Sequence, residues 1–231
     1  PSVYDPEILV EVGPQSSGLG SAFAISSDGW WITARHVVDA CSRVGIIVSR
    51  GSAAPVRQVK VSLFADLALL KTDHGPAGLA IDTSEREFQV GQRAFHVGFP
   101  QGRPGEAYTR LIGRENLIAR GRYDVDEPVL TWAELGRTSG LRGSLAGISG
   151  GPAFDANGQV IGVTIAESAR RGRIYTASPA TILHMLRIEQ VHAQGAPAPR
   201  FTADNYGQQS DALRRSLAVA QVVCVTDRAR S

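Results

Sequence analysis

Gly147-Ile148-Ser149-Gly150-Gly151-Pro152 is the stretch of this sequence that decides its fold. A serine set among glycines and a proline suits neither a helix nor a hydrophobic core, but it suits a tight turn. Because glycine accepts positive φ and has no Cβ, such a turn exposes the hydroxyl of Ser149 and points neighbouring backbone N–H groups into the same space. A nucleophilic serine needs that arrangement, with donors placed where a carbonyl oxygen gains negative charge. Taken alone, the same six residues also suit an ordinary hairpin loop.

The composition is that of an ordinary globular protein. The 231 residues are 43% hydrophobic and 20% charged, with a net charge of +2. A chain of this length can bury a sizeable core as one large domain or two lobes. The small net charge predicts no nucleic-acid partner, and no run approaches the roughly 18 apolar residues of a membrane-spanning segment. The sequence starts at Pro1 without a leader, as a mature or trimmed terminus does.

Short strand patterns fill the chain up to residue 177. The 25 glycines and 12 prolines predict many turns between them. Since no helical period separates these strands, the pattern predicts an all-β fold of antiparallel barrels or a sandwich. The strands are expected at 8–12, 21–25, 30–33, 44–48, 56–61, 67–71, 92–97, 108–112, 116–120, 129–134, 160–165 and 174–177, with 108–112 and 116–120 forming a hairpin.

The periodicity changes near residue 178. Apolar residues then recur every three to four positions after Ser178-Pro179, a capping pair, which predicts a helix over about 179–192. Residues 195–199, Gly-Ala-Pro-Ala-Pro, predict a stiff linker. We expect residues 193–231 to be this linker and a C-terminal tail with a short helix and a short strand.

Two residues earlier in the chain offer what a nucleophilic serine requires. Attack by a hydroxyl on an acyl carbon needs a base of near-neutral pKa and a group that orients that base. His36 ends a predicted strand, and Asp66 precedes the apolar run 67–70. The order His, Asp, Ser is that of the chymotrypsin architecture and differs from those of subtilisin and the α/β-hydrolases. We expect His36, Asp66 and Ser149 to form a catalytic triad.

Together these motifs resemble those of the chymotrypsin-like (trypsin-fold) serine endopeptidases. Thr-Ala-x-His at 33–36, Asp-Leu-Ala-Leu-Leu at 66–70 and Gly-x-Ser-Gly-Gly-Pro at 147–152 stand in that family's order. The loop Gly-Phe-Pro-Gln-Gly at 98–102 is similar to the bacterial HtrA/Deg branch. The resemblance covers about residues 8–190. Only about thirty residues follow the linker, fewer than the PDZ domain that this branch appends, so we expect the protease domain without one.

The resemblance implies two perpendicular six-stranded antiparallel β-barrels with a C-terminal helix and a short tail. The first barrel would span about 8–85 and the second about 88–180, within a trypsin-like serine protease domain of residues 1–192. The site would lie in the cleft between the barrels.

The same resemblance assigns the oxyanion hole to the backbone N–H groups of Gly147 and Ser149. Digestive members of the family carry an aspartate before the serine, which pairs with a new N-terminus during activation. Here that residue is Ile148, so this activation salt bridge is impossible, and we expect a domain that folds competent or is controlled by other means.

By motif alignment, the primary specificity pocket (S1) is expected to be lined by Gly143, Ser144, Thr164, Ile165, Ala166 and Glu167. No acid stands at Gly143, where cleavage after Lys or Arg would need one. The small and apolar lining favours a small to medium apolar residue at P1, the substrate position before the cleaved bond. Two alternatives stay open: Glu167 reaching into the pocket, and Arg142 attracting acidic side chains.

The two cysteines, Cys41 and Cys224, fit one disulfide or two free thiols. We hypothesise a disulfide, because it would tie the C-terminal tail beside the loop of His36, where little else holds it. No metal or cofactor motif is present, and we expect none to be bound. Four further histidines match no motif and are interpreted as structural or surface residues: His74, His96, His184 and His192.

The sequence therefore predicts a serine endopeptidase that cleaves protein or peptide substrates through an acyl-enzyme. The family's habit implies a periplasmic or secreted location. Two other functions are considered. One is a latent or inactive protease-fold binding or scaffold protein regulated by its C-terminal tail, and the other is an esterase with the same triad.

Overall fold

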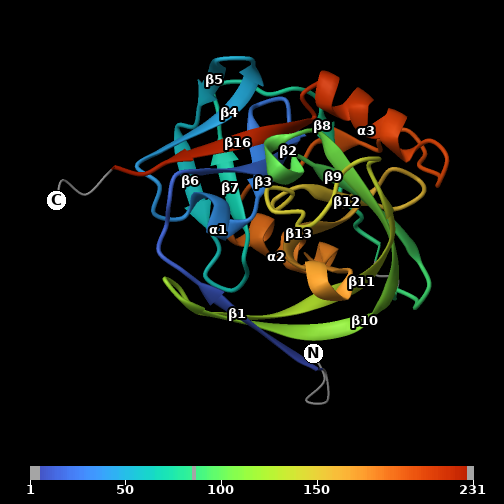
Figure 1. Ribbon diagram of the computed structural model, residues 1–231. Coiled ribbons are helices and arrows are strands. Elements are labelled where there is room, and N and C mark those ends of the chain that lie inside the picture. Colours follow the sequence, from blue (N-terminus) through green and yellow to red (C-terminus); the bar gives the residue numbers. More distant parts are fainter. Residues whose placement is uncertain (1–5, 85–86, 228–231) are drawn as a thin grey trace.

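The computed structural model describes residues 6–84 and 87–227, and they form two large β-sheets with three helices around them (Figure 1). The order of neighbouring strands in the first sheet is β5 (Ser52–Pro55), β4 (Arg43–Ser49), β16 (Val219–Val225), β2 (Gly18–Ser26), β3 (Trp30–Thr33), β7 (Ala68–Lys71) and β6 (Gln58–Val61).

This first sheet closes through a bend between β5 and β6. The backbone N–H of Val56 donates to Val44 O at 3.0 Å, which continues the pairing of β5 with β4. The next N–H, that of Arg57, donates to Lys71 O at 2.7 Å and so begins the pairing of β6 with β7. β5 and β6 are therefore two halves of one bent strand, and the sheet is a barrel of six strands in this sense.

The second sheet also closes on itself. Its order is β1 (Glu7–Val12), β10 (Gly105–Gly121), β11 (Val125–Arg137), β14 (Arg173–Ala177), β13 (Val160–Ser168), β12 (Pro152–Phe154) and β9 (Arg93–Gly98). Because β9 pairs with β10 as well as with β12, the six strands β9 to β14 form a closed barrel, and β1 is added outside it.

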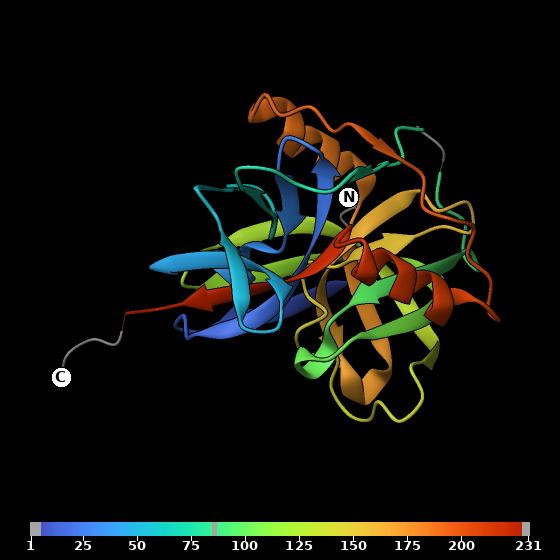
Figure 2. The same cartoon turned by 90° about the horizontal axis from the view of Figure 1, so that it is seen from above.

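The strands nearest the two ends of the chain lie in barrels that the sequence did not predict for them. Residues 8–12 were expected to begin the first barrel, but β1 instead pairs in parallel with β10 of the second. The central place between β2 and β4 belongs to β16 from the C-terminal tail, whose Val219 and Val222 are fully buried (Figure 2). A strand so rich in valine suits a buried position, whereas β1 leaves Leu9 77% exposed. The C-terminal tail therefore contains the expected strand, and this strand is part of the first barrel.

The predicted hairpin of 108–112 and 116–120 is also wrong. The chain stays extended through Gly113, where the pairing register shifts, and β10 runs unbroken over 17 residues. Its antiparallel partner is β11, and the turn between the two lies at residues 122–124. This long hairpin, green to yellow in Figure 1, reaches beneath the first barrel.

The helices are short and lie around the barrels. α1 (Arg35–Val38) follows β3, and α2 (Pro179–Ile188) begins at a cap where Ser178 Oγ accepts from Thr181 N at 3.3 Å. The prediction of a helix starting at 179 is confirmed, although it ends at 188. α3 (Tyr206–Arg215) lies in the tail, β8 (Gly78–Leu79) pairs with β15 (Gly195–Ala196), and one-turn 3-10 helices occupy Pro100–Gly102 and Ala169–Arg171. Within the described residues, we find no helix whose length and apolar character would let it span a membrane.

Candidate active site

His36 and Asp66 meet at the edge of the first barrel. His36 lies in α1, directly after β3, and Asp66 lies two residues before β7, the neighbour of β3 in the sheet. His36 Nδ1 is 2.6 Å from Asp66 Oδ2, and the backbone N–H of His36 donates to Asp66 Oδ1 at 2.8 Å. The Asp66 side chain is 8% exposed and that of His36 is 32% exposed. The pair therefore has its carboxylate inside and its imidazole at the surface of the cleft.

The pKa of His36 reflects two opposing effects. Burial lowers the pKa, but the charge of Asp66 and the hydrogen bond to it raise the pKa more, and the nearby Arg122 lowers it. The result is a pKa above the ordinary value for histidine. A carboxylate on Nδ1 fixes the tautomer of a neutral imidazole, leaving Nε2 as the proton acceptor.

The turn that carries Ser149 depends on its glycines. Gly150 has φ +87°, and a Cβ there would lie 2.1 Å from Ser21 O and 2.3 Å from Thr33 Oγ1. No other residue type fits that position without a shift of the backbone of the first barrel. The N–H of Ser21 in turn donates to Ser149 O at 2.8 Å. The serine turn is thus pinned directly to β2.

The peptide between Ala146 and Gly147 has a defined direction. Ala146 O accepts from the backbone N–H of Gln101 at 2.6 Å. Because the C=O and N–H of a trans peptide point in opposite directions, the N–H of Gly147 points away from Gln101. Within the described residues, neither this N–H nor that of Ser149 has a hydrogen-bond partner. Two donors are thus left open beside the serine.

One cavity brings these groups together. It has a volume of about 510 Å³, and His36, Asp66, Gly147 and Ser149 all line it. Its walls come from both barrels, from the end of β1 and from the segment 13–16 that follows it. A second cavity of about 800 Å³ lies against α2 and contains none of these residues. The candidate active-site cleft is therefore the cavity of about 510 Å³.

The six residues expected around the S1 pocket divide into three groups. Ile165, Ala166 and Glu167 line the cavity, whereas Gly143 and Ser144 lie outside its wall and are exposed. The expectation for Thr164 is wrong. Its side chain is fully buried on the other side of β13, and its hydroxyl lies 3.1 Å from His96 Nδ1.

Glu167 spans the space between β13 and the serine loop. Its Oε1 accepts from Leu145 N at 2.7 Å and also from Ser144 Oγ. Arg142, the other residue considered for specificity, is exposed, and its backbone oxygen accepts from Gln101 Nε2 at 2.7 Å. Glu167 therefore closes one side of the cleft with its carboxylate.

Three residues of the β10–β11 turn region also reach this site, and sequence reasoning missed them. Tyr123 donates its hydroxyl to Asp66 Oδ1 at 2.7 Å, and Glu127 Oε1 accepts from Asp66 N at 2.7 Å. Arg122 donates to His36 O at 3.3 Å. Nothing in the local sequence marks them, because the contact depends on a hairpin of the second barrel reaching the first.

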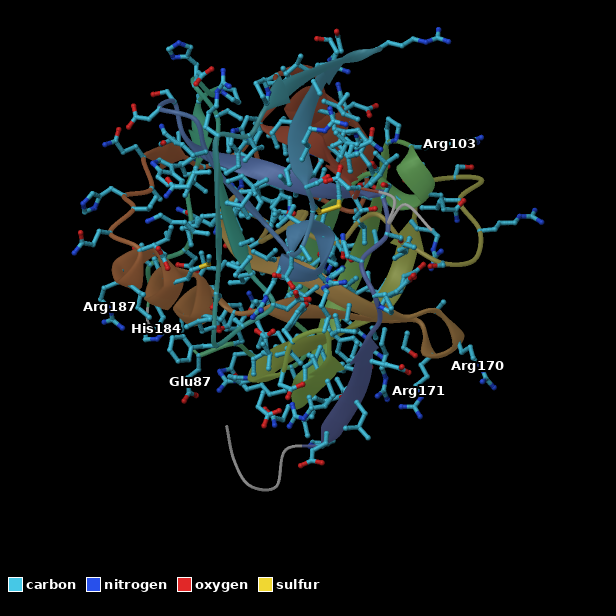
Figure 3. The ribbon with its side chains drawn as sticks, turned by 90° about the vertical axis from the view of Figure 1, so that its left-hand side faces the viewer. Glu87, Arg103, Arg170, Arg171, His184 and Arg187 are labelled. Atoms are coloured by element: carbon cyan, nitrogen blue, oxygen red, sulfur yellow. A yellow bond between two sulfur atoms is a disulfide. The ribbon has the colours of Figure 1, made fainter. Side chains whose placement is uncertain are left out.

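Cys41 and Cys224 form a disulfide, with an S–S distance of 2.00 Å, visible as the yellow bond in Figure 3. It ties β16 to the segment after α1, five residues from His36. Figure 3 also shows Arg170 and Arg171 pointing outward from the turn between β13 and β14.

His96 is fully buried and does not line the active-site cavity. Its ring lies between the hydroxyls of Thr164 and Thr109, at 3.1 and 3.0 Å, and burial lowers its pKa to about 3. It is therefore neutral at ordinary pH. Its role is structural, as the sequence indicated.

Two six-stranded barrels, with a histidine and an aspartate from the first and an exposed serine turn from the second, define the chymotrypsin-like class of fold. The model of the trypsin-like peptidase domain family matches residues 20–163. The chain belongs to this family, which confirms the predicted all-β fold class and the resemblance.

The relatives lie in the HtrA/Deg branch. HhoB of Synechocystis sp., a serine protease by name, is 30% identical over 164 residues, which is 71% of this chain and 38% of the relative. A DegP-like protein of Bartonella henselae, named as a periplasmic serine endoprotease, is 30% identical over 150 residues, or 64% of this chain and 28% of the relative. The chain thus spans less than two fifths of the length of these relatives.

Among solved structures, the active form of the Rv3671c protease from M. tuberculosis is similar with a TM-score of 0.61. The two are 22% identical, and the match covers 78% of this chain and 77% of that one. At this identity the likeness concerns the fold.

Proposed function

We propose that this chain is a serine endopeptidase with Ser149 as nucleophile, His36 as general base and Asp66 as the group that orients His36. The observation that carries the proposal is the 2.6 Å contact between His36 Nδ1 and Asp66 Oδ2 in the cavity that Ser149 also lines. A base held by a carboxylate in the same cavity as a serine hydroxyl is the arrangement that acyl transfer requires.

In the first half of the proposed reaction, Ser149 Oγ attacks the carbonyl carbon of the scissile peptide, and its proton passes to His36 Nε2. The carbonyl oxygen becomes an oxyanion, which the N–H groups of Gly147 and Ser149 stabilise. The loss of one such donor typically reduces turnover by about 10²–10³. The C–N bond then breaks, His36 returns the proton to the leaving amine, and an acyl-enzyme remains.

In the second half, a water molecule takes the place of the amine. His36 accepts a proton from this water as its oxygen attacks the ester carbonyl of the acyl-enzyme. The bond to Ser149 Oγ breaks, the proton on His36 goes to Oγ, and the product leaves as a carboxylic acid. Asp66 stabilises the imidazolium in both halves without taking its proton.

For the P1 residue, we propose a small to medium apolar side chain. Ile165 and Ala166 give the cavity an apolar wall. Glu167 Oε1 accepts hydrogen bonds from Leu145 N and Ser144 Oγ. These bonds narrow the cavity further and engage the Glu167 carboxylate. A difference of one methylene selects by about 1–3 kcal/mol, so the preference is graded.

For its location, we propose an oxidising extracytoplasmic compartment such as the periplasm. The disulfide between Cys41 and Cys224 supports this, since such bonds persist in oxidising compartments. The name of the DegP-like relative from Bartonella henselae, a periplasmic endoprotease, points the same way. Protein or peptide substrates are the corresponding partners.

The experiment is a comparison of Ser149→Ala and Ser52→Ala with the unchanged chain on a library of peptides that vary at P1. Ser52 is exposed on β5 and serves as the matched control. We expect Ser149→Ala to lose cleavage by at least about 10³-fold with an unchanged thermal transition, and Ser52→Ala to retain it. Equal cleavage by the unchanged chain and Ser149→Ala would refute the assignment.

A further inference from the structure

The carboxylate of Asp66 is held by a residue from the opposite barrel. Tyr123 lies in the turn between β10 and β11 of the second barrel, whereas Asp66 belongs to the first. The Tyr123 hydroxyl donates to Asp66 Oδ1 at 2.7 Å, and Tyr123 is only 7% exposed. Its pKa is raised by burial and by the charge of Asp66, so the hydroxyl keeps its proton and remains a donor.

The hydrogen bond from Tyr123 restricts the terminal side-chain torsion of Asp66, which sets the plane of its carboxylate. Rotation of an aspartate carboxylate about its terminal bond is soft, with broad and roughly two-fold preferences. Asp66 Oδ1 accepts from the backbone N–H of His36 at 2.8 Å and from Tyr123 at 2.7 Å. With two donors on Oδ1, the plane of the carboxylate is fixed and Oδ2 faces His36 Nδ1.

The turn that carries Tyr123 is itself firmly attached to the first barrel. The Arg35 guanidinium lies 3.9 Å from the centre of the Tyr123 ring. Arg122, the preceding residue, donates to Asp39 Oδ2 at 3.2 Å and to His36 O at 3.3 Å. The position of the hydroxyl is therefore not free to follow a rotating carboxylate.

We propose that Tyr123 is a positioning residue of the site, which acts on His36 by fixing the orientation of the Asp66 carboxylate. The inference rests on the proposed function for its effect on turnover, but the positioning itself concerns only the His36–Asp66 pair. The charged and titratable groups that face this pair are Arg35, Arg122, Asp39 and Glu127.

The direct test is the pKa of His36 in Tyr123→Phe, measured by NMR titration of the imidazole in a Ser149→Ala background. This readout needs no enzymatic activity. The phenylalanine keeps the ring and removes only the donor. Tyr108→Phe is the matched control, because Tyr108 lies at the other end of the same hairpin and its hydroxyl donates to neither residue of the pair.

We expect the pKa of His36 to fall by about half a unit or more in Tyr123→Phe, because a loosened carboxylate stabilises the imidazolium less. Tyr108→Phe should leave it unchanged. An unchanged pKa would overturn the proposal. A rise in the pKa of His36 would also overturn the proposal. It would mean that the Tyr123 hydroxyl only weakens the negative charge of the Asp66 carboxylate and does not orient it. A Tyr123→Phe chain that no longer folds would assign the hydroxyl to stability instead.

Turnover gives the second readout. With Ser149 present, we expect Tyr123→Phe to lower kcat about tenfold with KM within a factor of two, as loss of a hydrogen bond to a charged group implies. If the unchanged chain cleaves no peptide while the pKa of His36 still falls in Tyr123→Phe, the proposed function fails and the positioning role stands. If cleavage is present and both readouts are unmoved, the positioning role fails alone.

Discussion

His36 contacts Asp66 with its backbone and its ring at once, at 2.8 Å from N to Oδ1 and at 2.6 Å from Nδ1 to Oδ2. The double contact ties the direction of the imidazole to that of the main chain of α1. A ring held in this way keeps Nε2 toward the cleft without help from a bound substrate. The site is therefore organised before binding, and its properties can be tested on the free protein.

The first prediction concerns the pH dependence of kcat/KM. The base must be neutral to accept a proton, so activity is lost as pH falls through the pKa of His36. Because Asp66 raises that pKa, we expect the acid limb to have its midpoint above about 6.5. Initial rates from pH 5 to 9 measure it. A midpoint well below 6.5 would contradict the pairing of His36 with a charged carboxylate.

The contribution of His36 to folding stability should change with pH in the opposite direction to the activity. The raised folded pKa means that His36 contributes stability below its unfolded pKa, and this contribution is lost as pH rises through the folded pKa. The free enzyme thus becomes active over the same pH range in which this contribution is lost.

The second prediction concerns Gln101. Its backbone N–H holds Ala146 O, and its side-chain Nε2 donates to the carbonyls of Arg142 and Ser144 at 2.7 and 2.8 Å. Gln101→Asn keeps a residue that tolerates φ +54° but is too short for these two bonds. We expect kcat to fall about tenfold with little change in KM, because the oxyanion donors loosen.

A matched control exists for this variant. Gln190 also has φ +54° and lies at the end of α2, outside the active-site cavity. Gln190→Asn should leave kcat unchanged. Equal kcat values for the Gln101 and Gln190 variants would show that the side chain of Gln101 does not support the loop.

The three side chains of the proposed triad could be predicted from sequence because each stands in a local motif. The supporting residues could not. Tyr123 and Glu127 reach Asp66 only because a 17-residue strand runs unbroken where a hairpin of 108–112 and 116–120 was predicted. Pairing between distant segments leaves no such local mark, and for the same reason the places of β1 and β16 were missed.

The third prediction concerns the C-terminal tail. If the C-terminal tail kept the enzyme latent, removal of the residues after Gly195 would raise turnover. β16 instead lies between β2 and β4 and is linked to the segment after α1 by the disulfide of Cys41 and Cys224. We expect the truncated chain to lose its cooperative thermal transition and all cleavage. A folded truncated chain with raised turnover would restore the latent interpretation.

The fourth prediction concerns Glu127, which is 1% exposed and accepts from Asp66 N. Burial and the charge of Asp66 raise its pKa to about 8. A carboxyl with a raised folded pKa binds more protons when folded, so stability falls as pH rises from about 4.5 to 8.

Glu127→Gln removes this titration and keeps an oxygen for Asp66 N. We expect Tm to depend much less on pH in the variant than in the unchanged chain over pH 5–8, as measured by calorimetry. Parallel Tm curves for the two proteins would mean that Glu127 ionises near its ordinary pKa.

The central claim is that one serine of this chain is activated by the His36–Asp66 pair. The most direct measurement is labelling with a fluorophosphonate, followed by peptide mass spectrometry to locate the modified residue. We predict a single adduct on Ser149 that forms in the unchanged chain and is lost in His36→Ala. An adduct on another serine, or labelling of Ser149 that does not depend on His36, would contradict the account.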